Sequence, residues 1–165
     1  MKDIQVRTMI TEDWLSVKSI YENGIKTGIA TFETTAPSWE EWNDSHLKIG
    51  RLVAIIDNTI AGWIALSPVS SRCVYGGVAE ISVYVHEDYR KKGIGKKLLK
   101  MAISESEEND IWTLQAGVFR ENIGSIELHK KVGFRVIGFR ERIGKIKGEW
   151  KDNVILERRS EVVGI

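Results

Sequence analysis

The sequence predicts a mixed fold of the α/β (α+β) class, in which helices cover a central sheet. Stretches with strand-like alternation and stretches with a helical apolar stripe follow one another in the order β-α-α-β-β-β-α-β-α-β-β. The chain has 165 residues, which is enough for one ordinary domain and too few for two. No repeat, low-complexity stretch or linker divides it. We therefore expect a single domain over residues 1–165, with about seven strands and about four helices.

The first predicted elements are a strand and two helices. Residues 4–10 alternate and indicate a strand. The helix that follows should be capped by Thr11 and should stop around Gly24. After a loop over residues 26–37, Ser38 should cap the second helix. One side of that helix then carries three rings at i, i+3 and i+7 spacing: Trp39, Trp42 and His46.

The middle of the chain predicts a hairpin and a further strand. Residues 52–56 and 60–69 flank a short polar turn, which is typical of a β-hairpin. Residues 78–86 alternate strictly, so their side chains should divide between the two faces of a sheet. One face carries Ala79, Ile81, Val83 and Val85, and the other carries Glu80, Ser82 and Tyr84.

The last part of the chain predicts two helices and three strands. An apolar stripe indicates a helix that runs to about Asn109. Residues 111–119 indicate a strand, and a short helix should begin at Asn122 and end at Gly133. The stripe consists of Ile94, Leu98, Leu99, Ala102 and Ile103. The two closing strands are residues 135–144 and 149–158.

Composition narrows the classes of protein. The net charge is +1, whereas a general binder of nucleic acid or anionic membranes would usually carry a larger basic excess. Hydrophobic residues make up 42% and charged residues 28%, which are values of a globular protein. The single Cys73 excludes an intrachain disulfide framework and fits a reducing compartment. With no apolar targeting segment at the N-terminus, we expect a cytoplasmic protein.

A glycine turn joins a strand to a helix at Gly93 and Gly95, with basic residues around it. Free backbone N–H groups and the positive end of the helix dipole favour a phosphate at such a turn. The turn is neither a Walker A loop, because its length differs and the hydroxyl residue is missing, nor a dinucleotide fingerprint, because Leu98 stands where the third glycine belongs. A solvated, merely capped helix is the alternative. What counts against that alternative is Glu80, a carboxylate within an otherwise apolar strand.

These segments resemble the GCN5-related N-acetyltransferase (GNAT) family. Residues 90–95 (RKKGIG) match the family pattern [RQ]-x-x-G-x-[GA] between a strand and a helix, and residues 121–134 resemble the second family motif. Five further stretches resemble the phosphinothricin and methionine sulfoximine acetyltransferases: AEISVYV, LHKKVGF, SRCVY, TF and GEWKD. The resemblance covers essentially the whole chain. It implies a mostly antiparallel sheet.

The resemblance also implies acetyl-CoA as co-substrate. Backbone N–H groups would hold its pyrophosphate, basic side chains would add charge, and the strand before the turn, splayed from its neighbour, would lend backbone groups to the pantetheine arm. The pyrophosphate cradle would be Gly93, Ile94, Gly95 and Lys96, with Arg90, Lys91 and Lys92 as the basic side chains. The pantetheine arm would lie against Val83, Tyr84 and Val85, and Asn122 would bind it in addition to capping a helix.

Acetyl transfer to an amine needs a deprotonated nitrogen, so a general base is useful. Glu80 is the candidate, and we expect it to be half-buried, acting directly or through one water. A strand residue that faces solvent is the alternative. His129 could protonate the leaving thiolate, bind the substrate carboxylate or be structural. Cys73 lacks a supporting motif for covalent catalysis, and no residues have metal-ligand spacing, so we expect no metal.

The resemblance places the acceptor near four residues that precede Glu80 in the chain. Arg72 could pair with a carboxylate or phosphinate, and Phe32 could form an apolar wall. The set is Thr31, Phe32, Arg72 and Tyr75, together with Glu80. The sequence departs from this branch of the family at three positions on the acceptor side: Val69, Ser70 and Ala79. The branch is usually dimeric, so the resemblance also implies a homodimer.

The expected function is therefore transfer of acetyl to the amine of a small amino acid or a toxic amino-acid analogue, with no nucleic-acid or membrane partner. Two alternatives stay open. One is a protein or peptide N-acetyltransferase, against which the bulky loop over residues 30–42 argues. The other is a non-catalytic module that binds CoA or nucleic acid through its lysines, with the salt dependence typical of such binding.

Overall fold

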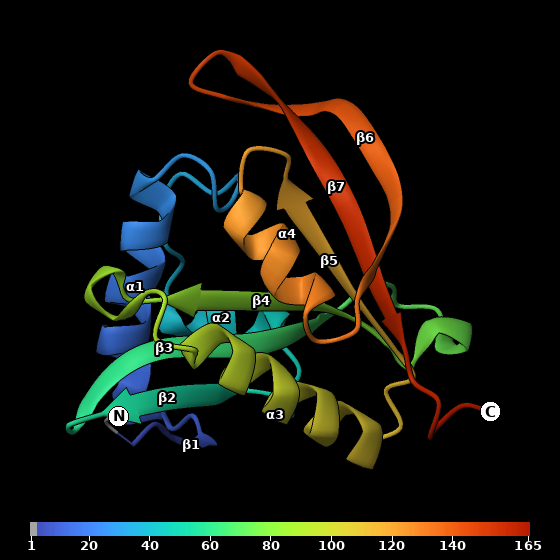
Figure 1. Ribbon diagram of the computed structural model, residues 1–165, viewed down its shortest axis with the longest axis horizontal. Helices are drawn as coiled ribbons and strands as arrows, with labels where there is room; N and C mark the ends of the chain where they lie inside the picture. Colours follow the sequence, from blue (N-terminus) through green and yellow to red (C-terminus); the bar gives the residue numbers. More distant parts are fainter. Residues whose placement is uncertain (1–2) are drawn as a thin grey trace.

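All seven strands form one sheet, in the order β1-β2-β3-β4-β5-β7-β6 (Figure 1). The structure is a computed structural model that describes residues 3–165. Neighbouring strands are antiparallel except β4 and β5, which are parallel. The strands are β1 Gln5–Thr8, β2 Leu52–Ile56, β3 Thr59–Pro68, β4 Val78–Val85, β5 Thr113–Phe119, β6 Arg135–Ile146 and β7 Glu149–Arg159. The predicted fold class and the mostly antiparallel sheet are thereby confirmed.

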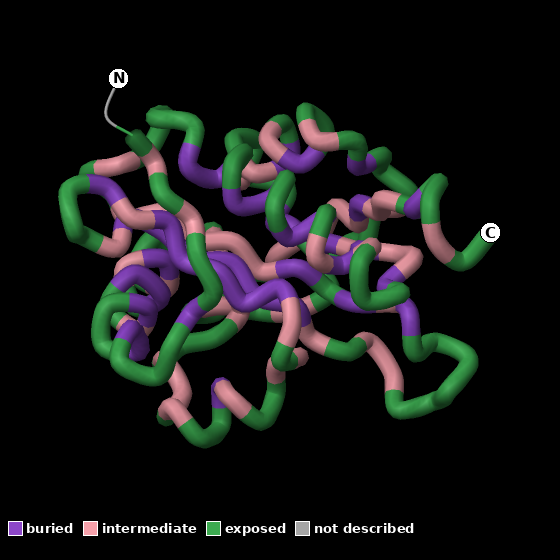
Figure 2. Tube along the Cα trace, turned by 90° about the horizontal axis from the view of Figure 1, so that it is seen from below, coloured by how far each residue is buried: buried purple, intermediate pink, exposed green. Residues whose placement is uncertain are grey.

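Helices cover both faces of this sheet. Helices α1 (Trp14–Lys26) and α2 (Trp39–Ser45) cover one face, and α3 (Ile94–Glu108) and α4 (Ile123–Lys130) cover the other (Figure 1). Alternation along β3 supplies both cores, because Trp63 and Ala65 pack with α1 and α2 while Ile64 and Leu66 pack with α3. Figure 2 shows the buried strands as a band through the middle of the molecule, with exposed segments around it.

The parallel strands β4 and β5 are paired over a short distance only. Their register runs Val78↔Thr113, Ala79↔Leu114 and Glu80↔Gln115, and ends there. Beyond Glu80 the strands diverge, β4 toward α1 and β5 toward the β6–β7 hairpin (Figure 1). The backbone of Ile81–Val85 on its β5 side is therefore not part of a ladder. The structure thus contains the splay that the family resemblance implied.

Two predicted helix signals are wrong. Thr11 does not cap α1, because a 3-10 turn over Thr11–Asp13 comes first and the Asp13 carboxylate accepts from Ile10 N at 2.9 Å. The helix also continues past Gly24 to Lys26. Gly24 serves packing instead, since a Cβ at this position would lie 2.7 Å from the Tyr84 ring.

Other local predictions are confirmed. The Ser38 hydroxyl accepts from Glu41 N at 3.2 Å, and the Glu41 carboxylate accepts from Ser38 N at 2.9 Å, which forms a complete capping box. The predicted ring row stacks, with 6.0 Å between Trp39 and Trp42 and 4.2 Å between Trp42 and His46. His46 is thereby partly buried, and His86 is also only partly exposed. Helix α2 itself ends earlier than predicted, at Ser45.

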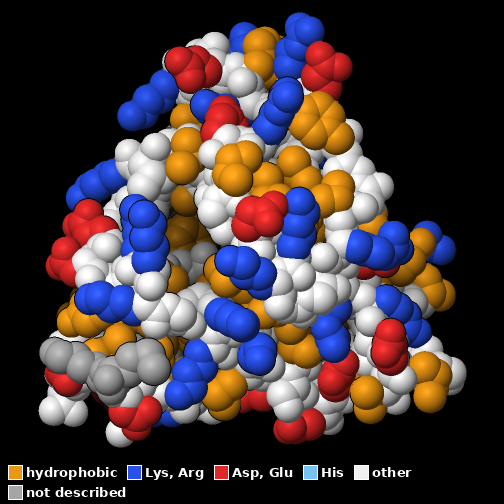
Figure 3. Space-filling model, in the orientation of Figure 1, with side chains coloured by type: hydrophobic (Ala, Val, Ile, Leu, Met, Phe, Trp, Pro, Cys, Tyr) orange, Lys and Arg blue, Asp and Glu red, His pale blue; other side chains and the backbone are white. Residues whose placement is uncertain are grey.

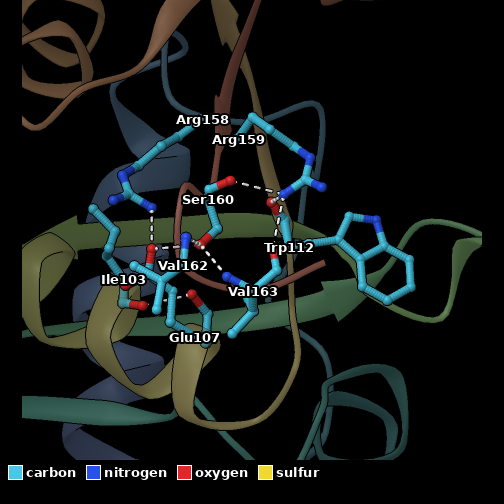
Figure 4. Close-up of polar contacts among 9 residues, drawn as sticks. Ile103, Glu107, Trp112, Arg158, Arg159, Ser160, Val162 and Val163 are labelled. Atoms are coloured by element: carbon cyan, nitrogen blue, oxygen red, sulfur yellow. Dashed lines mark hydrogen bonds and ion pairs between the residues drawn. The ribbon is translucent and has the colours of Figure 1, made fainter. Parts of the chain in front are cut away.

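The C-terminal segment is held to α3 by a partly buried polar cluster (Figure 4). The Glu107 carboxylate accepts from Arg158 and from the Ser160 hydroxyl, each at 2.9 Å. The Ser160 hydroxyl oxygen in turn accepts from Val162 N and Val163 N. Burial alone would raise the pKa of Glu107, but the hydrogen bonds from Arg158 and Ser160 outweigh it and leave the pKa below its ordinary value. This cluster fixes the last strand and lies away from the splay.

Candidate active site

A cavity of about 1060 Å³ lies where β4 and β5 diverge. Its walls come from β4, β5, the start of α3, one side of α4, and the loop between α1 and α2. Figure 3 shows Lys and Arg side chains gathered over α3 on the same side of the molecule as α4. The predicted site residues on its wall are Thr31, Phe32, Glu80, Val83, Tyr84, Val85, Arg90, Lys91, Gly93, Ile94, Gly95, Lys96, Asn122 and His129.

The start of α3 forms one end of this cavity. The N-cap is Gly93, with φ +86° and no capping side chain, so the first N–H groups of the helix are left for another partner. A Cβ at Gly93 would meet no atom within 4 Å, which leaves the backbone open to approach. Gly95 differs, because its Cβ would lie 2.8 Å from Leu128 of α4. The second glycine therefore also allows α3 and α4 to pack closely.

The basic residues around this turn do not act alike. Arg90, Lys91 and Lys96 line the cavity. Lys92 does not, since its ammonium donates to Asp88 O at 2.8 Å and lies 4.8 Å from the centre of the Tyr89 ring. Lys97 donates to Ile4 O and so ties α3 to the N-terminal segment. Their positions in the sequence alone do not distinguish these lysines.

Glu80 stands at the last rung of the β4–β5 pairing. Its carboxylate accepts from Gln115 Nε2 at 3.3 Å, and the two residues are register partners. The side chain is exposed to the cavity, so the expectation of a half-buried carboxylate is wrong. The reason is that the cavity opens at this rung, where β4 and β5 part, so this side chain faces open space and not a packed element. In this position the carboxylate can accept a proton from a molecule bound in the cavity.

His129 is buried within the wall of the cavity. It is 2% exposed, and its Nδ1–H donates to Ser125 O at 2.7 Å, which leaves Nε2 without a proton. Nε2 is buried and has no hydrogen-bond partner among the described residues. Burial lowers the pKa of His129, so the ring is neutral at pH 7. In this state Nε2 can accept a hydrogen bond but cannot donate one.

Thr31 and Phe32 connect the loop between α1 and α2 to the sheet. Thr31 lies beside the phenols of Tyr21 and Tyr84, and burial raises the pKa of both phenols. The Phe32 ring lies edge-on to Phe119 of β5, with 4.5 Å between centroids. A Cβ at Gly144 of β6 would lie 2.6 Å from the Phe32 ring, so this ring also closes against the β6–β7 hairpin.

Both the oxygen and the nitrogen of the Asn122 side-chain amide form hydrogen bonds. Its Oδ1 accepts from Ser125 N at 3.2 Å, which is the predicted helix cap. Its Nδ2 donates to Ile29 O at 3.3 Å, which ties α4 to the loop between α1 and α2. One amide hydrogen remains for a ligand in the cavity.

Arg72 and Tyr75 are not brought to the cavity within one chain. Both are exposed on the loop before β4, where the guanidinium lies 5.4 Å from the centre of the Tyr75 ring. The sequence also missed several cavity residues: Gln115, Phe119, Arg140 and Asn153. Alternation in TLQAGVF places Gln115 and Phe119 on one strand face, but only the sheet register shows that this face is the one that carries Glu80.

A splayed parallel strand pair beside a helix that starts at glycines is the arrangement that the family resemblance implied. The sequence profile described as "Acetyltransferase (GNAT) family" matches residues 13–134. The chain therefore belongs to the GNAT acetyltransferases.

Particular relatives sharpen this assignment. The chain is 30% identical over 159 residues to the phosphinothricin N-acetyltransferase of Alcaligenes faecalis, covering 93% of this chain and 81% of that protein. The crystal structure of a phosphinothricin acetyltransferase from Sinorhizobium meliloti, in complex with acetyl-CoA, has a TM-score of 0.86 at 25% identity, covering 98% of this chain and 95% of that one. A ribosomal-protein-alanine N-acetyltransferase from Brucella melitensis has a TM-score of 0.86 at 26% identity, with 94% and 99% covered.

The protein is an acetyl-CoA-dependent N-acetyltransferase of the GNAT type. The residues present fit acetyl-CoA, because the open backbone at Gly93 can take a pyrophosphate and the unpaired edge of Ile81–Val85 can take an extended arm. Among residues 3–165 no three His, Cys, Asp or Glu side chains are grouped so that they could hold a metal ion. Within the same range, no helix is both long and apolar enough to cross a membrane.

Proposed function

We propose that the protein transfers acetyl from acetyl-CoA to the amine of a small amino acid, or of a toxic analogue of the phosphinothricin or methionine sulfoximine type. Transfer takes place by direct attack within a ternary complex. The observation that carries this proposal is the placement of the Glu80 carboxylate in the same cavity as the Gly93 turn, at the rung where β4 and β5 part. The named relatives include enzymes for such amino acids, among them one for L-methionine sulfoximine and L-methionine sulfone.

Each end of the cavity has its own task in this proposal. The N–H groups of Gly93, Ile94, Gly95 and Lys96 bind the pyrophosphate, and Arg90 and Lys91 add charge. Backbone groups of Val83–Val85 hold the pantetheine arm as an added strand, and Asn122 donates its second amide hydrogen to it. Acetyl-CoA supplies an acetyl thioester, which this placement leaves beside Ser82 and Glu80. Lys92 has no direct contact in this scheme because it binds Asp88 O instead.

Glu80 is the general base. It removes a proton from the acceptor ammonium, directly or through one water, and the freed amine attacks the thioester carbonyl. The C–S bond breaks and the electron pair leaves with sulfur, which takes up the second proton lost by the attacking nitrogen as the amide forms. Gln115 fixes the carboxylate by its hydrogen bond, and positioned bases of this kind contribute about 10²–10⁴-fold to rates.

His129 is a hydrogen-bond acceptor in the proposal, not a second base. Protonating the thiolate or binding a carboxylate would require a proton on Nε2, and burial opposes that charged form. A neutral ring with a free Nε2 instead accepts a hydrogen bond from an N–H or O–H group of a molecule in the cavity. The ring is held in this orientation by Ser125 O and by the edge-on Phe134 ring, 5.1 Å away.

A panel of acceptors tests the proposal. Free thiol is followed with acetyl-CoA and methionine sulfone, methionine sulfoximine, phosphinothricin, common amino acids and short peptides that begin with alanine. We expect turnover with free amino acids, because Phe32 closes the acceptor side against Phe119 and β6. Turnover with peptides alone would favour the second candidate, a protein N-acetyltransferase, whose supporting observation is the similarity to the Brucella melitensis enzyme. Membership of an acetyltransferase family leaves the non-catalytic alternative without support.

The protein is further proposed to be a cytoplasmic homodimer. Strand β6 is an edge of the sheet and carries several exposed apolar side chains, and edge strands are the usual templates for pairing with another chain. The exposed side chains are Val136, Ile137, Phe139 and Ile143, with Trp150 on β7. Light scattering after gel filtration should give twice the chain mass of 18.7 kDa. A monomer at micromolar concentration would contradict the homodimer. A Phe139→Lys variant with the mass of the wild-type dimer would contradict pairing through β6.

A further inference from the structure

The sheet face that carries Glu80 continues across β5, β7 and β6, and this continuation contains polar side chains without partners. Register pairs Gln115 with Glu157, Gly117 with Ile155, and Phe119 with Asn153 across β5 and β7. It also pairs Asn153 with Arg140 across β7 and β6. Since register partners share a face, Glu80, Gln115, Asn153 and Arg140 all lie on one side of the sheet. All four line the cavity.

Small residues leave room between the two polar ends of this face. Ile155 pairs with Gly117 on one side and Gly138 on the other, so the row between Gln115 and Asn153 has one side chain where three would fit. A Cβ at Gly138 would meet no atom within 4 Å. Gln115 and Phe119 are four residues apart on β5, or ~13 Å. Arg140, which pairs with Asn153 opposite Phe119, has a side chain long enough to reach over the small residues toward Gln115.

Asn153 holds an unused acceptor. Its Oδ1 is buried and has no hydrogen-bond partner among the described residues. A buried polar atom without a partner costs free energy, so the site favours a state in which an N–H group reaches this oxygen. The nearest long donor by register is the guanidinium of Arg140, directly opposite.

Arg140 holds an unused positive charge. Within residues 3–165 its guanidinium forms no hydrogen bond or ion pair, whereas the acids around it are engaged. Glu141 binds Arg142 at 3.2 Å, Asp152 lies 3.6 Å from Arg120, and Glu121 binds Lys151 at 3.0 Å. The other charged residues that line the cavity are the acids Glu33, Glu80 and Glu127 and the bases Arg90, Lys91, Lys96 and Lys131. The wall thus carries charges of both signs, as binding of a zwitterionic acceptor requires.

We infer that Arg140 binds an acidic group of the acceptor, with Asn153 as the positioning residue that receives one guanidinium N–H and aims the rest of the fork. This inference rests on the proposed function and deepens it. Guanidinium groups bind carboxylates and phosphinates through two parallel hydrogen bonds, which suits both an amino acid and an acidic analogue. Arg140 takes this role within one chain, where Arg72 lies outside the cavity.

Three acceptors of one size test the subsite and identify the acid that it binds. Glutamate carries both acids, glutamine lacks the distal one, and isoglutamine lacks the α-carboxylate. In Arg140→Met we expect KM to rise about 10- to 100-fold for acceptors that retain the recognised acid, with KM for acetyl-CoA unchanged. A rise for glutamate alone, or for glutamate and isoglutamine, assigns the distal acid. A rise for glutamate and glutamine assigns the α-carboxylate. Asn153→Leu should raise the same KM values by a smaller factor, with kcat little changed.

Arg135→Met is the matched control, because Arg135 lies on the same strand but pairs with Glu157 at 3.0 Å and does not line the cavity. Equal KM changes for all three acceptors, or changes no larger than in Arg135→Met, would overturn the subsite. Calorimetry of acceptor binding to the CoA complex makes the same comparison without turnover. A wild-type protein that acetylates no amine would refute the proposed function, while calorimetry would still decide whether Arg140 binds the acid.

Discussion

The two ends of the cavity are built by different means. The proposed cofactor end consists of backbone groups, with Gly93 at φ +86° before α3 and the unpaired edge of Ile81–Val85 beside it. The proposed acceptor end consists of side chains from separate elements, among them Glu80 from β4 and Arg140 from β6. A backbone site depends on conformation, which a few glycines fix, whereas a side-chain site changes with each substitution. Substitutions in one fold can therefore change which acceptor is bound while binding of acetyl-CoA is retained.

The largest expected effect lies at the acceptor end. Glu80→Gln keeps the size of the side chain and its neighbour Gln115 but removes the base, so kcat should fall about 10²–10³-fold at pH 7. Acetyl-CoA affinity should remain the same, because the cradle is untouched. Stopped-flow thiol release and calorimetry measure the two quantities. An unaltered pH–rate profile would remove Glu80 from the mechanism.

The next effect lies at the cofactor end. Gly93→Val forces a branched side chain into the left-handed region and over the N–H groups of α3, so acetyl-CoA affinity should fall at least ~10-fold and stability by ~1–2 kcal/mol. Gly148→Val is the control, since Gly148 has φ +84° and its Cβ would also meet no atom within 4 Å. The control should lose similar stability and keep the affinity. Equal affinity in both variants would mean that the turn does not hold the pyrophosphate.

The sequence predicted the local geometry of turns and caps better than the surroundings of Glu80. The RKKGIG pattern around Gly93 is local, and so are the caps at Ser38 and Asn122, because the residues concerned are neighbours in the chain. The exposure of Glu80 was mispredicted, since it depends on where β5 leaves β4. That divergence is set by contacts between distant segments, which alternation along one strand does not encode.

Two further cases show the same limit. Gly24 is a residue type that commonly ends helices, yet here it lies within α1 and makes room for Tyr84, which is distant in the chain. Arg140 and Asn153 come together only through the β6–β7 register, which includes bulges after Val136 and Arg140. No pattern within either strand indicates that these two residues share a cavity with Glu80.

A smaller effect is expected far from both ends, at the C-terminal cluster. Ser160→Ala removes the donor to Glu107 and the acceptor for Val162 N and Val163 N, so stability should fall by about 1–2 kcal/mol. Urea unfolding measures it. Ser104→Ala is the control, because the exposed Ser104 donates to Glu108 at 3.2 Å, and it should change stability by less than ~0.5 kcal/mol. Loss of acetyl-CoA affinity in Ser160→Ala would show that this cluster is coupled to the cavity.

The smallest effect is a change in pH dependence. Burial lowers the pKa of His129 below 6.5, so the unfolded chain takes up a proton before the folded one does. Stability is fully present above pH 6.5 and falls as the pH drops toward the folded pKa. In His129→Phe the loss of stability between pH 7.5 and pH 5 should be smaller. Some loss should remain, because burial also lowers the pKa of His46. An unchanged slope would contradict the neutral, buried state of His129.

The most direct test of acetyl transfer across this cavity measures two products in one reaction. Free CoA and N-acetylated amino acid are quantified together over the acceptor panel, by thiol titration and mass spectrometry. We predict equal amounts of the two products with at least one free amino acid in the wild type and in Gly148→Val, and formation of both products about 10²–10³-fold more slowly in Glu80→Gln. Thiol release without an acetylated amino acid, or equal rates in Glu80→Gln, would contradict acetyl transfer at Glu80.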